Sequence, residues 1–123
     1  MQPTLFDPPD RAAPQEALWL EVKLACQFGE GGRTRSGYGT QWRRGVTGDL
    51  RKLAQDPLVH HAALALLVFT ESDEVLHKDL GLMEEVLTQQ QVLAGARQVR
   101  AVPIVDRRGH RVCAVALWPT ASR

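Results

Sequence analysis

The sequence has little cysteine, no long hydrophobic run and almost no excess of charge of either sign. Cys26 and Cys113 are the only cysteines in 123 residues, too few for a disulfide scaffold and without the paired spacing of a zinc site. No apolar run approaches the roughly 20 residues needed to cross a membrane, and residues 1–10 lack the basic start and apolar stretch of a secretory signal. We therefore expect a cytoplasmic protein in a reducing compartment, with no membrane contact.

The overall charge gives no general attraction to nucleic acid. Lys and Arg number 15 against 14 Asp and Glu, a net charge of +1, so any affinity for DNA must come from a local cluster. The length, together with 44% hydrophobic and 24% charged residues, is typical of one soluble domain and excludes a disordered or fibrous chain.

Prolines separate the beginning of the chain from the rest. Four of the seven prolines lie within residues 1–16, and proline removes a backbone donor and restricts the residue before it. We expect this part to be an extended arm or the remnant of a first core strand. Residues 17–118 are expected to form a single α/β domain, followed by a short tail at 119–123.

Hydrophobic patterns predict four strands and a long helix in that domain. Residues 17–26 alternate in polarity, which predicts a strand with one wholly apolar face. The apolar run 61–70 predicts a central strand covered on both faces. Ser72 is expected to cap a helix reaching Gly95. The last two β-rich runs, 97–106 and 111–118, are expected to pair as a hairpin around the turn 107–110.

Glycine dominates the segment between the first strand and the central strand. Residues 29–48 hold seven of the ten glycines, which predicts a mobile surface loop. A short helix at 48–55, capped by Thr47, is expected to follow it. The expected order is β-α-β-α-β-β after the proline-rich arm, with a mixed sheet flanked by helices.

Glu21 and Lys23 are charged residues two positions apart on the alternating strand, so their side chains point the same way. A carboxylate and an ammonium held side by side can bind a divalent metal and position a water for phosphodiester hydrolysis. The alternative is an ion pair at the edge of a sheet, because such triplets are common by chance.

The residues around this pair resemble the PD-(D/E)xK nuclease superfamily, the restriction-endonuclease-like proteins. Pro9 and Asp10 precede Glu21, the strand reads Leu-Trp-Leu-Glu-Val-Lys, and a helix and a buried strand are expected to follow. The resemblance covers 17–70, roughly half of the chain. It implies a restriction-endonuclease-like fold and metal-dependent hydrolysis of DNA.

The resemblance also implies roles for individual residues. Asp10 and Glu21 would be the metal ligands and Lys23 would contact the attacking water or stabilise the developing charge. The cofactor would be Mg²⁺ or Mn²⁺, and Asp7 is an equal candidate for the first acidic ligand. Whether the active site is complete stays open, and the alternative is an inactive member of the same fold that binds nucleic acid or protein.

The glycine-rich segment is the expected contact with DNA. Its arginines can bind phosphates while interleaved aromatic rings stack on bases. The alternative is a solvated loop without a ligand. The residues expected to contact nucleic acid are Arg33, Arg35, Arg43, Arg44, Tyr38 and Trp42.

The superfamily core begins with a helix and two strands before the Glu-x-Lys strand, whereas only 16 residues precede that strand here. The strand 17–26 would then lie at an open, apolar sheet edge, which favours pairing with another chain. We expect a homodimer, or a longer natural protein whose upstream residues complete the domain.

Overall fold

A computed structural model describes residues 13–34 and 37–120 and shows an α/β arrangement, which confirms the predicted class. Asp7, Asp10, Arg35 and most of the proline-rich arm lie outside the described residues. No helix in the described ranges is long and apolar enough to cross a membrane. The elements are β1 (Leu18–Cys26), a 3-10 turn (Glu30–Gly32), α1 (Tyr38–Gln55), β2 (His61–Thr70), α2 (Asp73–Gln89), β3 (Gln98–Arg107) and β4 (His110–Pro119).

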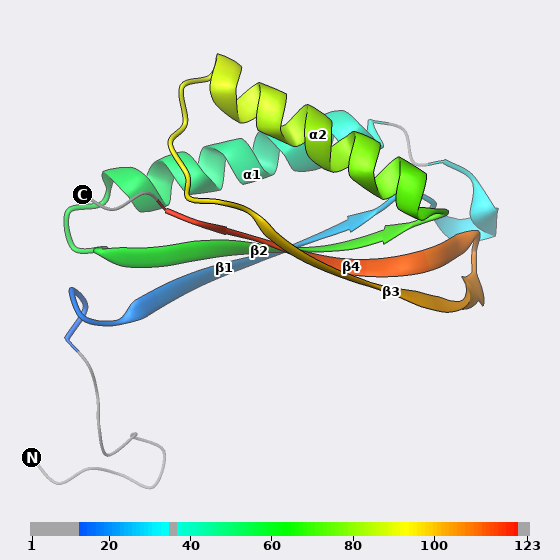
Figure 1. The fold of residues 1–123 in the computed structure, drawn as a ribbon, viewed down its shortest axis with the longest axis horizontal. Coiled ribbons are helices and arrows are strands. Elements are labelled where there is room, and N and C mark those ends of the chain that lie inside the picture. Colours follow the sequence, from blue (N-terminus) through cyan, green and yellow to red (C-terminus); the bar gives the residue numbers. More distant parts are fainter. Residues whose placement is uncertain (1–12, 35–36, 121–123) are drawn as a thin grey trace, which may run out of the picture.

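The four strands form one mixed sheet in the order β1-β2-β4-β3. β1 runs parallel to β2, whereas β4 runs antiparallel to both β2 and β3. Both helices lie over the same face of this sheet (Figure 1). β2 is therefore an interior strand, as predicted, but the prediction that both of its faces are covered is wrong for the described residues.

The hydrophobic core lies between the helices and the face of the sheet that they cover. Leu64 and Leu66 of β2 and Trp118 of β4 are completely buried there. Their neighbours on the opposite face, such as Leu67, are only half-buried. The helices contribute the buried side chains Trp42, Val46, Leu50, Leu76, Leu80, Met83 and Leu87.

The other face of the sheet is apolar and exposed. On β1 the side chains of Leu18, Leu20, Val22 and Leu24 are between 54 and 68% exposed. The strand register continues this surface across the half-buried apolar residues of β2 to Val115 of β4 and Val102 of β3. The predicted apolar side of β1 is thus present, but it points away from the core.

The prediction of a loop over 29–48 is wrong, because α1 begins at Tyr38. Tyr38, Trp42, Val46 and Leu50 recur every four residues, and the last three are buried against the sheet. Each interior glycine costs a helix about 1 kcal/mol relative to alanine, whereas burying one large apolar side chain contributes about 1.5–3 kcal/mol. Thr47 is therefore inside the helix rather than at its N-cap.

The second half of the chain follows the sequence prediction more closely. Ser72 caps α2 by accepting a hydrogen bond from the Val75 N–H at 3.2 Å. The helix ends at Gln89, short of the expected Gly95. β3 and β4 form the predicted hairpin, whose turn residues Arg108 and Gly109 both have positive φ, as a tight type I′ turn requires.

Candidate functional site

Glu21 and Lys23 project from the side of β1 that faces the helices. Strand residues alternate between faces, and Ala25, the next residue on this side, is buried beneath α1. Glu21 is exposed and Lys23 is half-buried. In the structure as described, Glu21 forms no ion pair, so the two neighbours are not paired with each other.

Lys23 is instead paired with Asp49 of α1. Its Nζ lies 2.8 Å from Asp49 Oδ2, and the two side chains are 31 and 20% exposed. Oδ2 is buried and has no hydrogen-bond partner in the described residues, so the ion pair with the ammonium is what balances its charge. Gly45, one turn earlier on α1, lies beside the lysine: a Cβ there would be in ordinary van der Waals contact with Lys23 Cε and Nζ, at 3.5 Å.

Sequence reasoning missed Asp49 as the partner of Lys23. It placed Asp49 in the first turn of a short helix, whereas Asp49 lies well inside α1. A glycine followed four residues later by an acid would have been the signal, since these positions share one helix face. Recognising it requires a helix that begins at Tyr38.

The described residues provide no complete metal site. Asp7 and Asp10, the alternative first ligands, lie outside them, and the described chain contains no group of three His, Cys, Asp or Glu side chains that could hold an ion. Glu21 is the one predicted metal ligand whose position is known, and its carboxylate is open to solvent.

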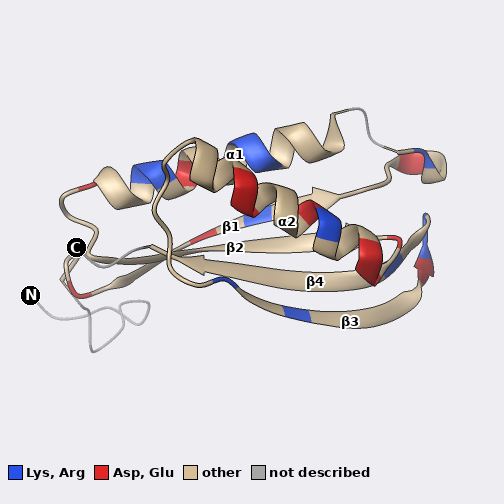
Figure 2. Cartoon of the chain, turned by 45° about the horizontal axis from the view of Figure 1, so that its top comes forward, with Lys and Arg blue, Asp and Glu red and all other residues tan. Residues whose placement is uncertain are grey.

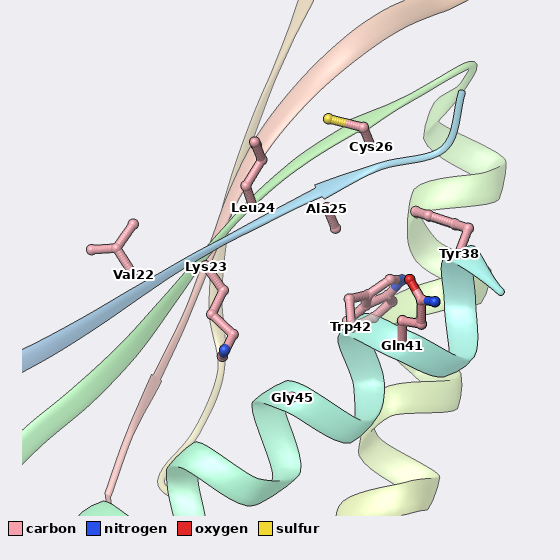
Figure 3. A pocket seen from close by; sticks show the side chains of 9 residues that line it. All are labelled: Val22, Lys23, Leu24, Ala25, Cys26, Tyr38, Gln41, Trp42 and Gly45. Carbon is pink, nitrogen blue, oxygen red and sulfur yellow. The ribbon is translucent and has the colours of Figure 1, made fainter. Parts of the chain in front are cut away.

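A groove of about 410 Å³ lies between β1 and the first half of α1. Figure 3 shows Lys23 and Ala25 pointing toward α1, with Val22 and Leu24 on the other side of the strand. Tyr38, Gln41, Trp42 and Gly45 line the groove from the helix.

The two aromatic residues predicted to stack on bases have structural contacts instead. Trp42 is 6% exposed, and its buried Nε1 has no hydrogen-bond partner among the described residues. The Tyr38 hydroxyl donates to Asp79 Oδ2 of α2 at 3.0 Å. Burial, then the charge of Asp79, raises the pKa of Tyr38 far above its usual value. The ring faces therefore serve packing between the two helices and the sheet, and the expected stacking role is not available to Trp42.

The predicted arginines fall into separate places. Arg33 is exposed beside the 3-10 turn, whereas Arg43 and Arg44 lie on α1. The Arg43 guanidinium lies 5.6 Å from the centre of the Trp42 ring, within the range of a cation–π contact.

A second groove, of about 500 Å³, joins Arg43 and Arg44 to Arg51 between α1 and α2. Arg51 donates to the Gln90 carbonyl at 3.2 Å. Figure 2 shows the basic segments on α1 and the mainly acidic segments on α2. Arg51 was not predicted, although it lies seven residues after Arg44, a spacing that shares one face of a helix.

The turn end of the β3–β4 hairpin packs on a buried histidine. His110 Nε2 accepts a hydrogen bond from the Phe28 N–H at 3.0 Å, and its ring lies near those of Phe28 and Phe69. Burial lowers the pKa of His110, and the charge of Arg108 acts in the same direction. These contacts make it a neutral, structural residue at neutral pH.

Comparison of the chain with known families, curated proteins and solved structures finds no match. The resemblance to PD-(D/E)xK nucleases therefore rests on the residues around Glu21 and Lys23.

Proposed function

We propose that this protein is a metal-dependent phosphodiesterase that acts on DNA, with Glu21 and Lys23 in its active site. The observation that carries the proposal is the arrangement of the Glu-x-Lys pair. An exposed carboxylate and an ammonium share one side of an edge strand, and Asp49 holds the ammonium at 2.8 Å. The proposal includes a restriction-endonuclease-like fold, a cytoplasmic location and association with a second copy.

Carboxylate oxygens suit Mg²⁺ or Mn²⁺ better than Zn²⁺ or Cu²⁺, which are commonly held by nitrogen and sulfur ligands. Mg²⁺ keeps several waters and commonly binds through one or two carboxylates together with substrate phosphates. Glu21 would provide such a carboxylate, and Asp10 or Asp7 would provide another. A bound ion would neutralise charge on the scissile phosphate and lower the pKa of a bound water.

Lys23 would act on the scissile phosphate, and Asp49 would position Lys23. The Lys23 ammonium would stabilise the negative charge that develops in the transition state. Asp49, with its buried Oδ2 against Nζ, restricts where that ammonium can lie. This positioning suits catalysis because a preoriented charge needs no reorganisation during the reaction.

The arginine groove would bind the DNA backbone. Arg43, Arg44 and Arg51 bring three positive charges to one groove, and arginine binds phosphate through paired N–H donors. Removing Arg44 and Arg51 together should flatten the slope of log affinity against log salt by up to about 2 on duplex DNA. Arg100→Gln, on the opposite face of the sheet, is the control.

Cleavage of DNA in Mg²⁺ or Mn²⁺ tests the proposal, using Glu21→Gln and Lys23→Ala beside the wild type. Both variants should lose cleavage by orders of magnitude, and Lys23→Ala should keep nearly the wild-type affinity. Lys52→Ala and Glu85→Gln, exposed residues elsewhere, should cleave normally. Full cleavage by Lys23→Ala would refute its role, and equal Mg²⁺ binding by wild type and Glu21→Ala in calorimetry would refute the metal site.

A nonenzymatic DNA-binding role is the second candidate. It is favoured by one observation, that the described residues hold no group of three metal-ligating side chains. It predicts the same salt dependence through the arginine groove, with no cleavage under any metal. The two candidate functions therefore differ in whether DNA is cleaved, and not in the affinity for DNA.

A further inference from the structure

One edge of β1 has no strand paired with it among the residues that the structure describes. β1 pairs with β2 through all nine of its residues, and in the described sheet no strand lies on its other side. The Gln27 N–H donates to the Phe69 carbonyl of β2 at 3.0 Å. Because successive strand residues direct their backbone groups to opposite edges, the odd-numbered residues of β1 face β2. The even-numbered residues direct their N–H and C=O groups to the open edge.

Open space borders this edge along residues 22–26. The groove between β1 and α1 runs beside residues 22–26, and α1 borders it without closing it. An open edge of nine residues that carries apolar side chains is a template for pairing with another chain. The charges on β1 indicate which chain that is.

We propose that β1 pairs antiparallel with β1 of a second copy, around a twofold axis at Val22. In this register the numbers of two opposite residues add up to 44. Glu21 therefore lies opposite Lys23 of the second copy. All nine residues of β1 overlap. Leu20 and Leu24 become cross-strand neighbours on the exposed apolar side, where such pairs stabilise a sheet.

The neighbouring registers are worse for identifiable reasons. An axis at residue 21 places Glu21 opposite Glu21, and an axis at residue 23 places Lys23 opposite Lys23; like charges directly opposite are destabilising. Each shift also removes two residues from the overlap. Registers between these would align an even-numbered with an odd-numbered residue, so that outward backbone groups would meet no partner.

The backbone phase strengthens the charge pairing. Even-numbered residues exchange the hydrogen bonds in this register, which makes Glu21 and Lys23 of the second copy a non-hydrogen-bonded pair. Side chains approach most closely at such pairs, with Cα atoms about 4.5 Å apart. The second copy's Glu21 would then join Asp49 beside Lys23, so that each site takes charged groups from both chains.

This inference does not rest on the proposed hydrolysis and is tested without metal or DNA. The wild type should be a dimer in light scattering at high micromolar concentration. Val22→Pro should fold but be monomeric, because its lost N–H points to the open edge, where proline is tolerated in a single chain. A monomeric wild type at every concentration overturns the proposal.

A charge exchange tests the register. Two variants are made, Glu21→Lys and Lys23→Glu, and each also carries Asp49→Asn. The Asp49→Asn change removes the carboxylate that would otherwise lie beside the new Glu at position 23. Each variant alone should dimerise weakly. Mixed together they should form a heterodimer at least about tenfold tighter, because both cross-strand pairs again join opposite charges. Glu85→Lys is the control, an equal charge change away from the edge, and should leave the dimer unchanged.

Two results would overturn this mode of pairing even if a dimer exists. One is a dimer that Val22→Pro leaves intact but Val102→Lys disrupts, since that pattern places the contact on the apolar face of the sheet. The other is equal affinity in the mixed and unmixed charge variants, since that would show Glu21 and Lys23 of opposite copies not to be neighbours.

Discussion

The Lys23–Asp49 ion pair should stabilise the fold by a measurable amount. Breaking a fully buried pair costs about 3–5 kcal/mol, whereas an exposed pair contributes about 0.2–1 kcal/mol. The side chains here are 31 and 20% exposed, which places the pair between these limits. Lys23→Met should lower the free energy of unfolding by about 1–2 kcal/mol, because it leaves the buried Asp49 Oδ2 without its partner.

A double-mutant cycle isolates the interaction itself. Lys23→Met, Asp49→Asn and the combined variant would be unfolded with urea and followed by circular dichroism. We expect a coupling free energy of about 1 kcal/mol, with most of it retained in 1 M salt, because partly buried pairs are screened less than exposed ones. Lys52→Met, an exposed lysine on the same helix, should change stability by less than about 0.5 kcal/mol. Coupling below about 0.3 kcal/mol would refute the pairing.

The remaining predictions concern backbone, pH and the two sides of the sheet. Gly48→Ala should stabilise the protein by about 0.5–1 kcal/mol in thermal unfolding, because it lies within α1 with open space at its Cβ. Gly109→Ala should destabilise it by about 1 kcal/mol or more, because φ is +94° there and a phenylalanine ring would lie 2.9 Å from the new Cβ. The free energy of unfolding should fall as pH drops below about 6.5, because His110 takes up a proton more readily in the unfolded chain than in the fold, where its pKa is lowered. His110→Gln should make this pH profile flatter. An unchanged profile would exclude His110 as its cause. Leu64→Ala should cost about 2–5 kcal/mol, while Val102→Lys on the uncovered face should cost less than about 0.5 kcal/mol; a large loss at Val102 would show that this face is covered in solution.

The parts of the fold that could be predicted are those whose signal is local. The alternation over 17–26 and the apolar run over 61–70 were sufficient for two strands, and Ser72 with the acids after it was sufficient for a helix start. The β3–β4 hairpin followed from a turn containing Gly109, although the predicted turn spanned 107–110 and the observed one has only Arg108 and Gly109. Each of these signals lies within about ten residues and does not depend on what packs against it.

The parts that could not be predicted depend on contacts between elements. The first part of α1 was missed because its glycines indicate a loop. The helix forms nevertheless, because burial of Trp42 and its neighbours against strands distant in sequence offsets the low helix propensity of glycine. Because this helix was not predicted in full, Trp42 was not assigned to the core and Asp49 was not placed beside Lys23. Which face of the sheet the helices cover is likewise a tertiary property: β1 directs its most apolar side outward, which alternation alone cannot reveal.

Two of the glycines that made α1 resemble a loop in the sequence lie beside its charged side chains. A Cβ at Gly39 would lie 2.8 Å from both terminal nitrogens of Arg43, so the bare backbone lets the guanidinium lie close against the helix and over Trp42. Gly45 lies beside the stem of Lys23, which reaches Asp49, and a Cβ there would make an ordinary van der Waals contact at 3.5 Å. Gly39 thus lowers the intrinsic helix propensity but allows a close approach of the Arg43 guanidinium to the backbone. One side of α1 holds the ammonium of the proposed active site, and the other holds the arginines of the proposed DNA contact, so a single glycine-rich helix fixes both relative to β1.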